Sequence, residues 1–384
     1  ATDMEFGWTT EQEDYRRRVR EALDELLPED WDERYVPESY ASDLQVEFSR
    51  EFCAGLAERG LLVPHWPKEY GGSESSDWAH FILGEEMKAA GEPRGAQYMN
   101  VNWIGPTLMK YGTAPQKNLH VKGIASGRVI WCQGFSEPDA GTDLPALRTR
   151  AERDGDHYVI NGSKIWTSYA RRADWCFLLV RTGPSRKDLT ILLVPMDSPG
   201  ISVTSYPGVI KFGHLNEVYF TDVRVPVGNR VGEEGQAWEI VSHALAYERV
   251  GVPRYHTGLD ALDLAVEQLK REGRWTGDPI VRAKAGRLVS QFEAARMLTY
   301  LVVDQRVKRM PPSADANLSR VVALHAVKDL MDFIAEYVPD CLAGGDVLLE
   351  DYYRINIPAG VTGGTNEIQL DLVANRGLSL PRER

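Results

Sequence analysis

The sequence predicts an α+β fold in three consecutive parts, because the spacing of its apolar residues changes twice along the chain. Up to about residue 127 the apolar residues recur at helical spacing. Over 128–235 they form short β-branched or aromatic segments bounded by Gly, Asp and Pro, which favours a compact antiparallel β domain of sandwich or barrel type. Helical spacing returns after that. We therefore expect an N-terminal helical domain at 1–127, a middle β domain at 128–235 and a C-terminal helical domain at 236–384.

Capping residues and glycines place the helices of the N-terminal part. Thr10 followed by Glu13 has the spacing of a capping box, and it predicts a helix that runs to Leu26. A glycine is expected to end each of two later helices, because glycine favours the backbone conformation that closes a helix. These further helices are expected at 43–59, 77–90 and from about residue 103 to Gly112.

The middle and C-terminal parts are divided by short turns. Four segments of the middle part have the composition of strands, namely Tyr158–Ile160, Trp175–Val180, Ile191–Val194 and Val218–Phe220. Between the C-terminal helices, turns are expected at Pro311–Pro312, Gly344–Gly345 and Gly363–Gly364.

Composition excludes several classes of protein. The 384 residues include 44 basic and 56 acidic side chains, and the net charge of −12 argues against nucleic-acid binding and against a polybasic membrane surface. No apolar run approaches the roughly 20 residues of a membrane span, and the N-terminus has no signal-peptide pattern. The four cysteines are scattered without a CxxC pair, so neither zinc nor a disulfide framework is indicated. We expect a soluble cytoplasmic protein without membrane insertion.

Several common catalytic motifs are absent. No GxGxxG follows a predicted strand, and there is no GxxxxGK[ST] phosphate loop. The sequence also lacks HExxH, GxSxG and a pair of histidines at ligand spacing, which argues against metal hydrolases and serine hydrolases.

Glu248 is a carboxylate on an otherwise apolar helical stripe. The stripe consists of Val241, Ala244, Leu245, Glu248, Gly251 and Val252. A carboxylate buried there must be paired or neutral, and a raised pKa is what a proton-abstracting base needs near neutral pH. The plainer alternative is an ion pair with Arg249 or a distant Lys, and the pattern alone leaves both open.

Three polar segments could together hold a flat aromatic cofactor with phosphates. They are Trp131–Asp143, Asn161–Ser168 and Gly363–Gln369. Backbone N–H groups and nearby hydroxyls can bond the edge of a heteroaromatic ring, an indole can pack on its face, and a glycine turn at a helix N-terminus can bind a pyrophosphate. Taken singly, each segment is more often an ordinary turn.

Taken together and in this order, these segments resemble the acyl-CoA dehydrogenase family. The matching motifs are Ser136-Glu-Pro-Asp-Ala-Gly-Thr-Asp143, Lys164-Ile-Trp-Thr-Ser168, Gly364-Thr-Asn-Glu-Ile-Gln369, Trp66–Gly72 and Gly105–Lys117. The resemblance covers essentially the whole chain. It implies a C-terminal four-helix domain, FAD bound in an extended form between subunits, an acyl-CoA thioester as substrate and an electron-transfer flavoprotein as electron acceptor.

The resemblance also implies roles for individual residues. Most members of the family place the catalytic base where this chain has Gly363, which has no side chain, and a minority take it from a Glu-Arg pair that corresponds here to Glu248 and Arg249. Arg249 would then help to orient the substrate, and Pro253 would bend the helix beyond the base. The implied flavin contacts are Phe135, Ser136, Gly141, Thr142, Trp166 and Ser168, with Thr142 also near the CoA moiety and with Thr365 and Glu367 at the dinucleotide-binding turn.

Two elements depart from the family pattern. The usual Arg-x-x-Phe-Gly element reads Gly273-Arg-Trp-Thr-Gly277 here, and the usual Gln-x-x-Gly-Gly-x-Gly element reads Cys341-Leu-Ala-Gly-Gly-Asp-Val347. Both elements serve the partner subunit's FAD site, and Asp346 near a pyrophosphate would be unfavourable. We therefore expect this chain to be the catalytic subunit of an α2β2 heterotetramer, similar to actinobacterial enzymes that oxidise steroid side-chain CoA esters. A homotetramer is the alternative assembly.

Two other functions remain open at this point. The same fold supports flavin oxidases and monooxygenases, in which Glu248 would serve equally well. The chain could also be a non-catalytic partner subunit that only completes another chain's cofactor site. Such a subunit would be expected to keep both FAD-binding elements and to lack a carboxylate at either base position.

Overall fold

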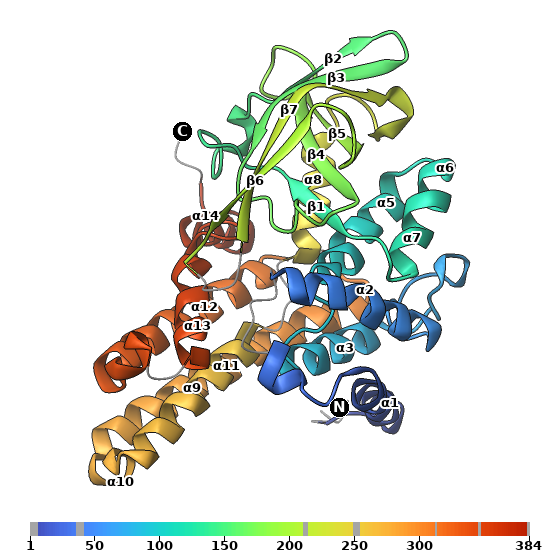
Figure 1. Cartoon of the computed structure of the whole chain (residues 1–384). Helices are drawn as coiled ribbons and strands as arrows, with labels where there is room; N and C mark the ends of the chain where they lie inside the picture. Colours follow the sequence, from blue (N-terminus) through green and yellow to red (C-terminus); the bar gives the residue numbers. More distant parts are fainter. Residues whose placement is uncertain are drawn as a thin grey trace.

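The computed structural model describes residues 7–35, 42–209, 214–248, 254–311, 313–344 and 347–381. Its helices and strands follow the expected order of helices, then strands, then helices (Figure 1). The described strands all lie between Trp131 and Val231, and helices lie on both sides of that stretch in the sequence. The α+β arrangement expected from the sequence is therefore confirmed.

The cap of the first helix lies one residue earlier than predicted. Helix α1 spans Thr10–Leu26, and its N-cap is Thr9, whose hydroxyl accepts the Gln12 N–H while the Gln12 side chain accepts the Thr9 N–H. The capping box predicted at Thr10 and Glu13 is therefore wrong by one position. A glutamine in the third helical position serves as well as the expected glutamate, because its amide oxygen is also an acceptor.

The remaining N-terminal helices pack around a short π-helical turn. Helices α2 and α3 span Asp43–Glu58 and Asp77–Ala89, close to the expected bounds. The helix expected from residue 103 begins earlier, since a π-helical turn, η3, covers Asn100–Ile104 and leads into α5, Gly105–Tyr111. The other elements are η1 Trp31–Tyr35, η2 Lys68–Tyr70, α4 Gln97–Met99, α6 Ala114–Gln116, η4 Lys117–Val121 and α7 Lys122–Ala125.

The eight strands form one hydrogen-bonded sheet. They are β1 Trp131–Gly134, β2 Arg150–Asp154, β3 His157–Lys164, β4 Trp175–Arg181, β5 Leu189–Pro195, β6 Ile201–Pro207, β7 His214–Pro226 and β8 Arg230–Val231. Their order is β6-β7-β3-β2-β4-β5-β8, with β1 beside β4. Each of the four predicted strand segments lies inside one of them. The sheet is not purely antiparallel as expected, because β1 and β2 both run parallel to β4.

Two halves of this sheet enclose a common apolar core. The strands β6, β7, β3 and β2 meet β4 only at the pair Arg150–Arg181. Buried residues from both halves nevertheless form one cluster, including Ile160 and Val223 from one half and Leu178 and Leu192 from the other. A sheet folded over its own core in this way fits the sandwich-or-barrel expectation.

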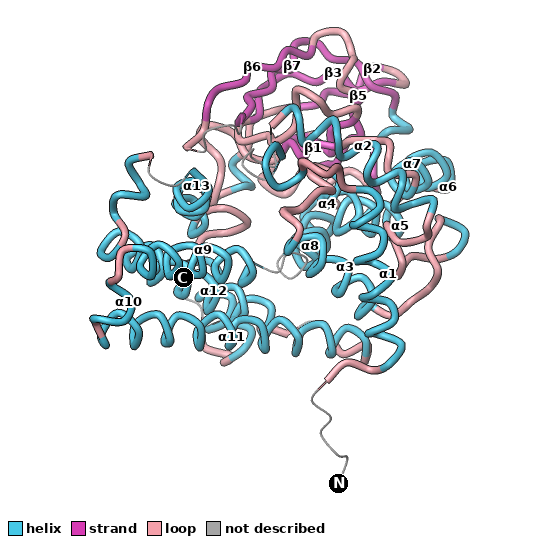
Figure 2. Tube along the Cα trace, turned by 60° about the horizontal axis from the view of Figure 1, so that its bottom comes forward, coloured by secondary structure: helices cyan, strands magenta, loops and turns pink. Residues whose placement is uncertain are grey.

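The C-terminal part is a bundle of long helices. It contains α8 Ala237–Glu248, α9 Arg254–Arg271, α10 Arg274–Gly277, α11 Pro279–Val307, α12 Asp315–Tyr337, η7 Pro339–Ala343, α13 Val347–Asn356, η8 Ile357–Gly360, α14 Asn366–Leu372 and η9 Val373–Gly377. Helices α9, α11, α12 and α13 contribute to a single buried cluster, which includes Leu262, Phe292, Leu330 and Leu349. Figure 2 shows α9, α11 and α12 side by side below the sheet. Among the described residues, no helix combines the length and the apolarity that a membrane span requires.

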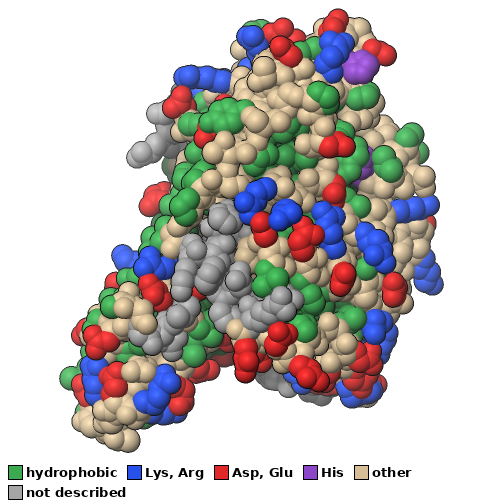
Figure 3. All heavy atoms as spheres, in the orientation of Figure 1, with side chains coloured by type: hydrophobic (Ala, Val, Ile, Leu, Met, Phe, Trp, Pro, Cys, Tyr) green, Lys and Arg blue, Asp and Glu red, His purple; other side chains and the backbone are tan. Residues whose placement is uncertain are grey.

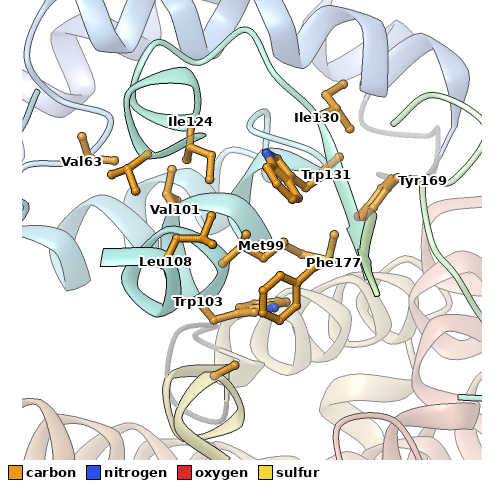
Figure 4. Close-up of a cluster of buried hydrophobic side chains, with 14 of the residues drawn as sticks. Val63, Met99, Val101, Trp103, Leu108, Ile124, Ile130, Trp131, Tyr169 and Phe177 are labelled. Carbon is orange, nitrogen blue, oxygen red and sulfur yellow. The ribbon is translucent and has the colours of Figure 1, made fainter. Parts of the chain in front are cut away.

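A third buried cluster joins the N-terminal helices, the inner side of the sheet and α8. Trp103, Trp131, Phe177 and Tyr169 lie close together in it (Figure 4). The Trp103 indole N–H donates to the Gln133 side-chain oxygen at 2.9 Å, so η3 is also tied to β1 by a hydrogen bond. This cluster sets where the loop after β1 emerges relative to α8.

Candidate active site

The loop that follows β1 is fixed to the end of β3. Phe135 is 6 % exposed, and its ring lies 6.1 Å from that of Phe177. The Ile165 N–H donates to the Ser136 carbonyl at 2.9 Å, and the Lys164 ammonium donates to the Phe135 carbonyl at 3.0 Å. Two of the polar segments singled out in the sequence are thereby joined.

A buried ion pair between Lys164 and Glu137 reinforces this junction. Lys164 Nζ lies 2.8 Å from Glu137 Oε1, and the two side chains are 0 % and 8 % exposed. Glu137 also accepts the backbone N–H groups of Arg148 and Thr149. Burial favours the neutral acid, but Lys164 and these donors outweigh it and lower the pKa of Glu137. Burial lowers the pKa of Lys164 to about 8, against the opposing effect of Glu137.

Trp166 presents an uncovered aromatic face directly after this junction. Its backbone is in the left-handed region, with φ of 57°, and the residue is 57 % exposed. Such a conformation costs about 1 to 3 kcal/mol for a residue that is not glycine, and it persists only where neighbours fix it. Here the next residue, Thr167, exchanges two hydrogen bonds with Asn216 of β7, at 3.0 and 2.9 Å. An indole held open to solvent at this energetic cost fits one face of a flat ligand.

Three hydroxyl side chains of the two loops make no hydrogen bond among the described residues. Within the described part of the chain, no hydrogen bond engages the side chain of Ser136, Thr142 or Ser168. A Cβ at Gly141 would meet no atom within 4 Å, so contacts within the chain do not require a glycine there. Hydroxyls without hydrogen bonds among the described residues can donate to the edge of a heteroaromatic cofactor, and the exposed Trp166 ring can pack on its plane. The residues present therefore fit a flavin.

The glycine turn before α14 is held from α12. Gly363 and Gly364 have φ of 67° and 94°, and the buried Gln369 side chain lies 3.4 Å from both of their carbonyl oxygens. Asn317 of α12 in turn donates to Gln369 at 2.7 Å. Thr365 caps α14, since its hydroxyl accepts the Ile368 N–H, while Glu367 is exposed. Gly363 offers no carboxylate at this turn.

Helix α8 has the predicted apolar face as far as its side chains are described. Val241 and Ala244 are each 1 % exposed, and Leu245 is half-buried against the same cluster. Phe135, in the loop after β1, and Tyr169, in the loop after β3, belong to that cluster as well. Glu248 is the last residue of α8. Its side chain and the whole of residues 249–253, including Arg249 and Pro253, lie outside the described residues.

A separate polar cavity of about 370 Å³ lies between α1, α3, α9 and α11. Its walls include Arg16, Glu85, His256 and Tyr300, and none of the predicted flavin contacts. The cavity therefore lies in a different region of the molecule from the loops that follow β1 and β3.

Sequence reasoning missed the roles of three residues that position the candidate site. Glu137 and Lys164 were both inside the motifs singled out, but their pairing across the loop could not be read from their separation in the sequence. Asn216 was missed because it lies on a distant strand. A lysine at the end of a strand, two residues before Trp166, was the available signal for a buried ion pair.

Comparison with known proteins decides the family. The N-terminal, middle and C-terminal domain models of acyl-CoA dehydrogenases match residues 9–128, 132–223 and 235–378. The chain belongs to the acyl-CoA dehydrogenase family. It is 33 % identical to acyl-CoA dehydrogenase FadE26 of Mycobacterium tuberculosis over 99 % of both chains. It is 32 % identical to acyl-CoA dehydrogenase IpdE1 of the same organism over 88 % of this chain and 89 % of that one.

Solved structures give the same assignment. This acyl-CoA dehydrogenase superposes on a steroid ACAD, Tcur3481-Tcur3483, with a TM-score of 0.87 and 32 % identity over 99 % of this chain and 100 % of that one. The ChsE4-ChsE5 complex of Mycobacterium tuberculosis gives a TM-score of 0.87 and 31 % identity over 99 % and 100 % of the two chains. Family membership makes the protein an oxidoreductase and implies a flavin cofactor.

Proposed function

We propose that this chain is the catalytic subunit of an FAD-dependent acyl-CoA dehydrogenase that introduces an α,β double bond into a bulky CoA thioester, such as that of a steroid side chain. Glu248 removes the α-proton of the substrate. FAD held by the two loops would supply the hydride-accepting chemistry for the β-hydrogen, with an electron-transfer flavoprotein as the electron acceptor.

The observation that carries this proposal is the indole of Trp166, held open in a left-handed backbone conformation. Phe135 packs beneath the start of the first loop, and Ser136, Gly141, Thr142 and Ser168 complete the side that would receive the flavin ring. Thr365 and Glu367 stand at the turn proposed for the dinucleotide, and Thr142 also contacts the CoA moiety. The buried Lys164–Glu137 pair keeps the two loops in register without help from a ligand.

Glu248 is the proposed base because the chain places no carboxylate at Gly363. Val241 and Ala244 give α8 an apolar face, and Glu248 is the last residue of that helix. Arg249 is proposed to orient the thioester. The other carboxylate of the same helix, Glu239, is poorly placed, since it is exposed and accepts the Tyr111 hydroxyl at 3.0 Å.

The substrate class rests on the relatives. The solved neighbour Tcur3481-Tcur3483 is a steroid ACAD, and its identity of 32 % over almost the whole chain supports a related substrate for this protein. A ring system attached to the acyl group would require a roomy pocket near Glu248.

An α2β2 assembly is proposed because Arg274 and Cys341 make contacts inside this chain. Both belong to the elements that usually serve the partner subunit's FAD site. Arg274 Nη1 donates to the Tyr337 carbonyl at 2.7 Å and pairs with Glu272 at 3.1 Å, so it is committed to its own fold. Cys341 is 3 % exposed within the C-terminal core, where the family has a glutamine. A homologous second chain would supply the missing contacts, and the similar ChsE4-ChsE5 structure is itself a complex.

The surface of the C-terminal helices supports an assembly of more than one chain. Hydrophobic side chains appear at the edge of the molecule that these helices form (Figure 3). On α11 the exposed apolar residues include Val289, Met297 and Leu301, which are 43 %, 48 % and 43 % exposed. Exposed apolar surface of this kind along a helix marks contact with a partner.

The test compares Glu248→Gln with Glu239→Gln on the same helix. Each variant is purified with the candidate partner chain, and reduction of an electron acceptor is followed with steroid-side-chain, octanoyl and butyryl CoA thioesters. Glu248→Gln should keep its flavin absorbance and lose turnover by at least about 10³-fold, whereas Glu239→Gln should retain it. Turnover retained in Glu248→Gln would overturn the base assignment. Oxygen consumption in place of acceptor reduction would identify an oxidase, and turnover supplied by the other chain alone would identify a non-catalytic subunit.

A further inference from the structure

Strand β6 forms one edge of the sheet and lies close to the turn that carries Trp166. Its neighbour β7 pairs with β3, and beyond the end of β3 the Thr167 N–H donates to the Asn216 carbonyl of β7 at 3.0 Å. On the other side of β7, Ser205 of β6 is the strand partner of Asn216. Thr167, Asn216 and Ser205 therefore lie in one row across the sheet.

Ser205 sets the orientation of the Asn216 side chain. The Ser205 hydroxyl donates to Asn216 Oδ1 at 2.7 Å, and Asn216 Nδ2 donates to the Thr167 carbonyl at 2.9 Å. Asn216 is buried. A flipped amide would place its oxygen against the Thr167 carbonyl, where neither group can donate. By donating to Oδ1, Ser205 favours the orientation in which the amide bonds to the residue that follows Trp166.

Tyr206, the next residue of β6, contacts Trp166 itself. The two ring centroids lie 6.0 Å apart at an interplanar angle of 70°, which is the edge-to-face arrangement that aromatic pairs favour. Burial raises the pKa of the Tyr206 hydroxyl, against the opposing effect of the Trp166 backbone, so the hydroxyl also lies beside that main chain. Tyr206 therefore restricts the indole, while more than half of Trp166 stays exposed.

The two residues of β6 act from opposite faces of the sheet. Successive side chains of a strand point to opposite faces, so Ser205 and Tyr206 reach the same turn from two sides. A left-handed backbone at a bulky residue such as Trp166 persists only where the surrounding contacts fix it. Contacts from both faces supply that constraint for the turn after β3.

We propose that Ser205 and Tyr206 are positioning residues for the cofactor, because they hold the Trp166 indole in the orientation that receives the flavin ring. The inference rests on the proposed function, in which Trp166 packs against the flavin. Neither residue of β6 touches the flavin in this proposal. They act only through Trp166 and the residue that follows it.

Four single changes separate this role from a general effect on the strands. Ser205→Ala removes the hydrogen bond to β7, and Tyr206→Leu removes the ring contact with Trp166. Ser202→Ala changes an exposed serine of the same strand, and Tyr219→Leu changes a tyrosine of β7 that is 40 % exposed. These two are controls, because among the described residues neither has a hydrogen bond or ring contact with the turn after β3.

The experiment measures how tightly the flavin-free enzyme, prepared as the complete assembly, binds FAD in a fluorescence titration. Urea unfolding of the same flavin-free samples reports their stability. Ser205→Ala and Tyr206→Leu should each raise the Kd for FAD by about 3- to 10-fold, which is the range expected for one hydrogen bond or one aromatic contact. The two controls should stay within about 2-fold. Tyr206→Phe keeps the ring contact and should restore most of the affinity.

A second set of titrations repeats the changes in the Trp166→Gly background. If Ser205 and Tyr206 act through the indole, Ser205→Ala and Tyr206→Leu should weaken FAD binding by less than about 2-fold once the indole is absent. Equal losses in both backgrounds would overturn the proposal. So would a lowered urea midpoint with an unchanged Kd, because that result means that the contacts serve the fold alone. If Tyr206→Leu does not fold, Ser205→Ala carries the same comparison.

The Trp166→Gly variant also separates failure of this inference from failure of the proposed function. Unchanged FAD affinity in Trp166→Gly would mean that the proposed flavin contact of Trp166 has failed. Lost affinity in Trp166→Gly, together with unchanged affinity in Ser205→Ala and Tyr206→Leu, would mean that the positioning inference alone has failed.

Discussion

Lys164 Nζ lies 2.8 Å from Glu137 Oε1 in a region from which water is almost excluded, and the pair joins the end of β3 to the loop after β1. An ion pair in such surroundings can be strongly destabilising once one partner is removed, because the other charge then lacks compensation. Loss of this ion pair should therefore change both the free energy of unfolding and the binding of the cofactor.

Replacing Lys164 with Met should destabilise the chain by about 3 to 5 kcal/mol and lower its flavin content. The exposed Lys187→Met is the control and should change the free energy of unfolding by less than about 0.5 kcal/mol. Urea unfolding and the ratio of flavin to protein absorbance measure the two effects. The double variant Lys164→Met with Glu137→Leu should recover part of the lost stability, and a further loss in the double variant would show that the pair is not the cause.

The effect of the Trp166 side chain on the free energy of unfolding should be measurable separately from its effect on flavin affinity. Trp166→Gly removes the indole and accepts the φ of 57° without steric cost, so the unfolding free energy of the cofactor-free chain should change by less than about 1 kcal/mol. The same variant should bind flavin at least about 10-fold more weakly, whereas Trp166→Phe, which keeps an aromatic face, should bind nearly as the unaltered chain does. Equal affinities of the glycine and phenylalanine variants would contradict a stacking role.

The double-glycine turn should tolerate no side chain at Gly364. A Cβ there would lie 2.6 Å from Gln369 Nε2, and the φ of 94° is unfavourable for alanine. Gly364→Ala should therefore cost about 1 to 3 kcal/mol of stability. Gly277→Ala is the matched control, because a Cβ at that position meets no atom within 4 Å. Thermal unfolding of the two variants in one buffer gives the comparison, and similar midpoints would refute the packing argument.

Acid should destabilise the chain through buried histidines. His120 is 6 % exposed between Trp131 and Trp175, and burial lowers its pKa from 6.5 to about 4. The unfolded chain therefore binds a proton before the folded one does, so stability decreases as the pH falls from about 6.5 to about 4, by up to about 3 kcal/mol for this group. His120→Phe should flatten the dependence of unfolding free energy on pH in that window. Urea unfolding at pH 7, 6 and 5 tests this, and an unchanged slope would count against it.

The sequence predicted the order of helices and strands because apolar spacing is a local property. The strands around Ile160, Leu178 and Leu192 were found from composition alone. The parallel pairing of β1 with β4 was not predicted, because it depends on how the chain runs through β2 and β3 before it returns to β1. The cap at Thr9 was missed by one residue because Thr9 and Thr10 both fit the local pattern, and the choice between them depends on how the chain enters the helix.

Residues of the candidate site were predictable where they belong to a contiguous motif. Trp166 and Ser168 were found in this way, and the apolar face of α8 was found from helical spacing. The residue that holds Trp166 in place was not, since Asn216 bonds to Thr167 from a strand that is far away in the sequence.

The parallel pairing of β1 with β4 has a consequence for the order in which the chain folds. Trp131 pairs with Trp175, so β1 gains its neighbour only after β2 and β3 have been synthesised and have folded back. Non-local strand pairing of this kind is slow, and until it occurs the apolar side of β1 has only the N-terminal helices to cover it. The bond from Trp103 to Gln133 connects β1 to those helices and would shield the growing chain from aggregation on the ribosome.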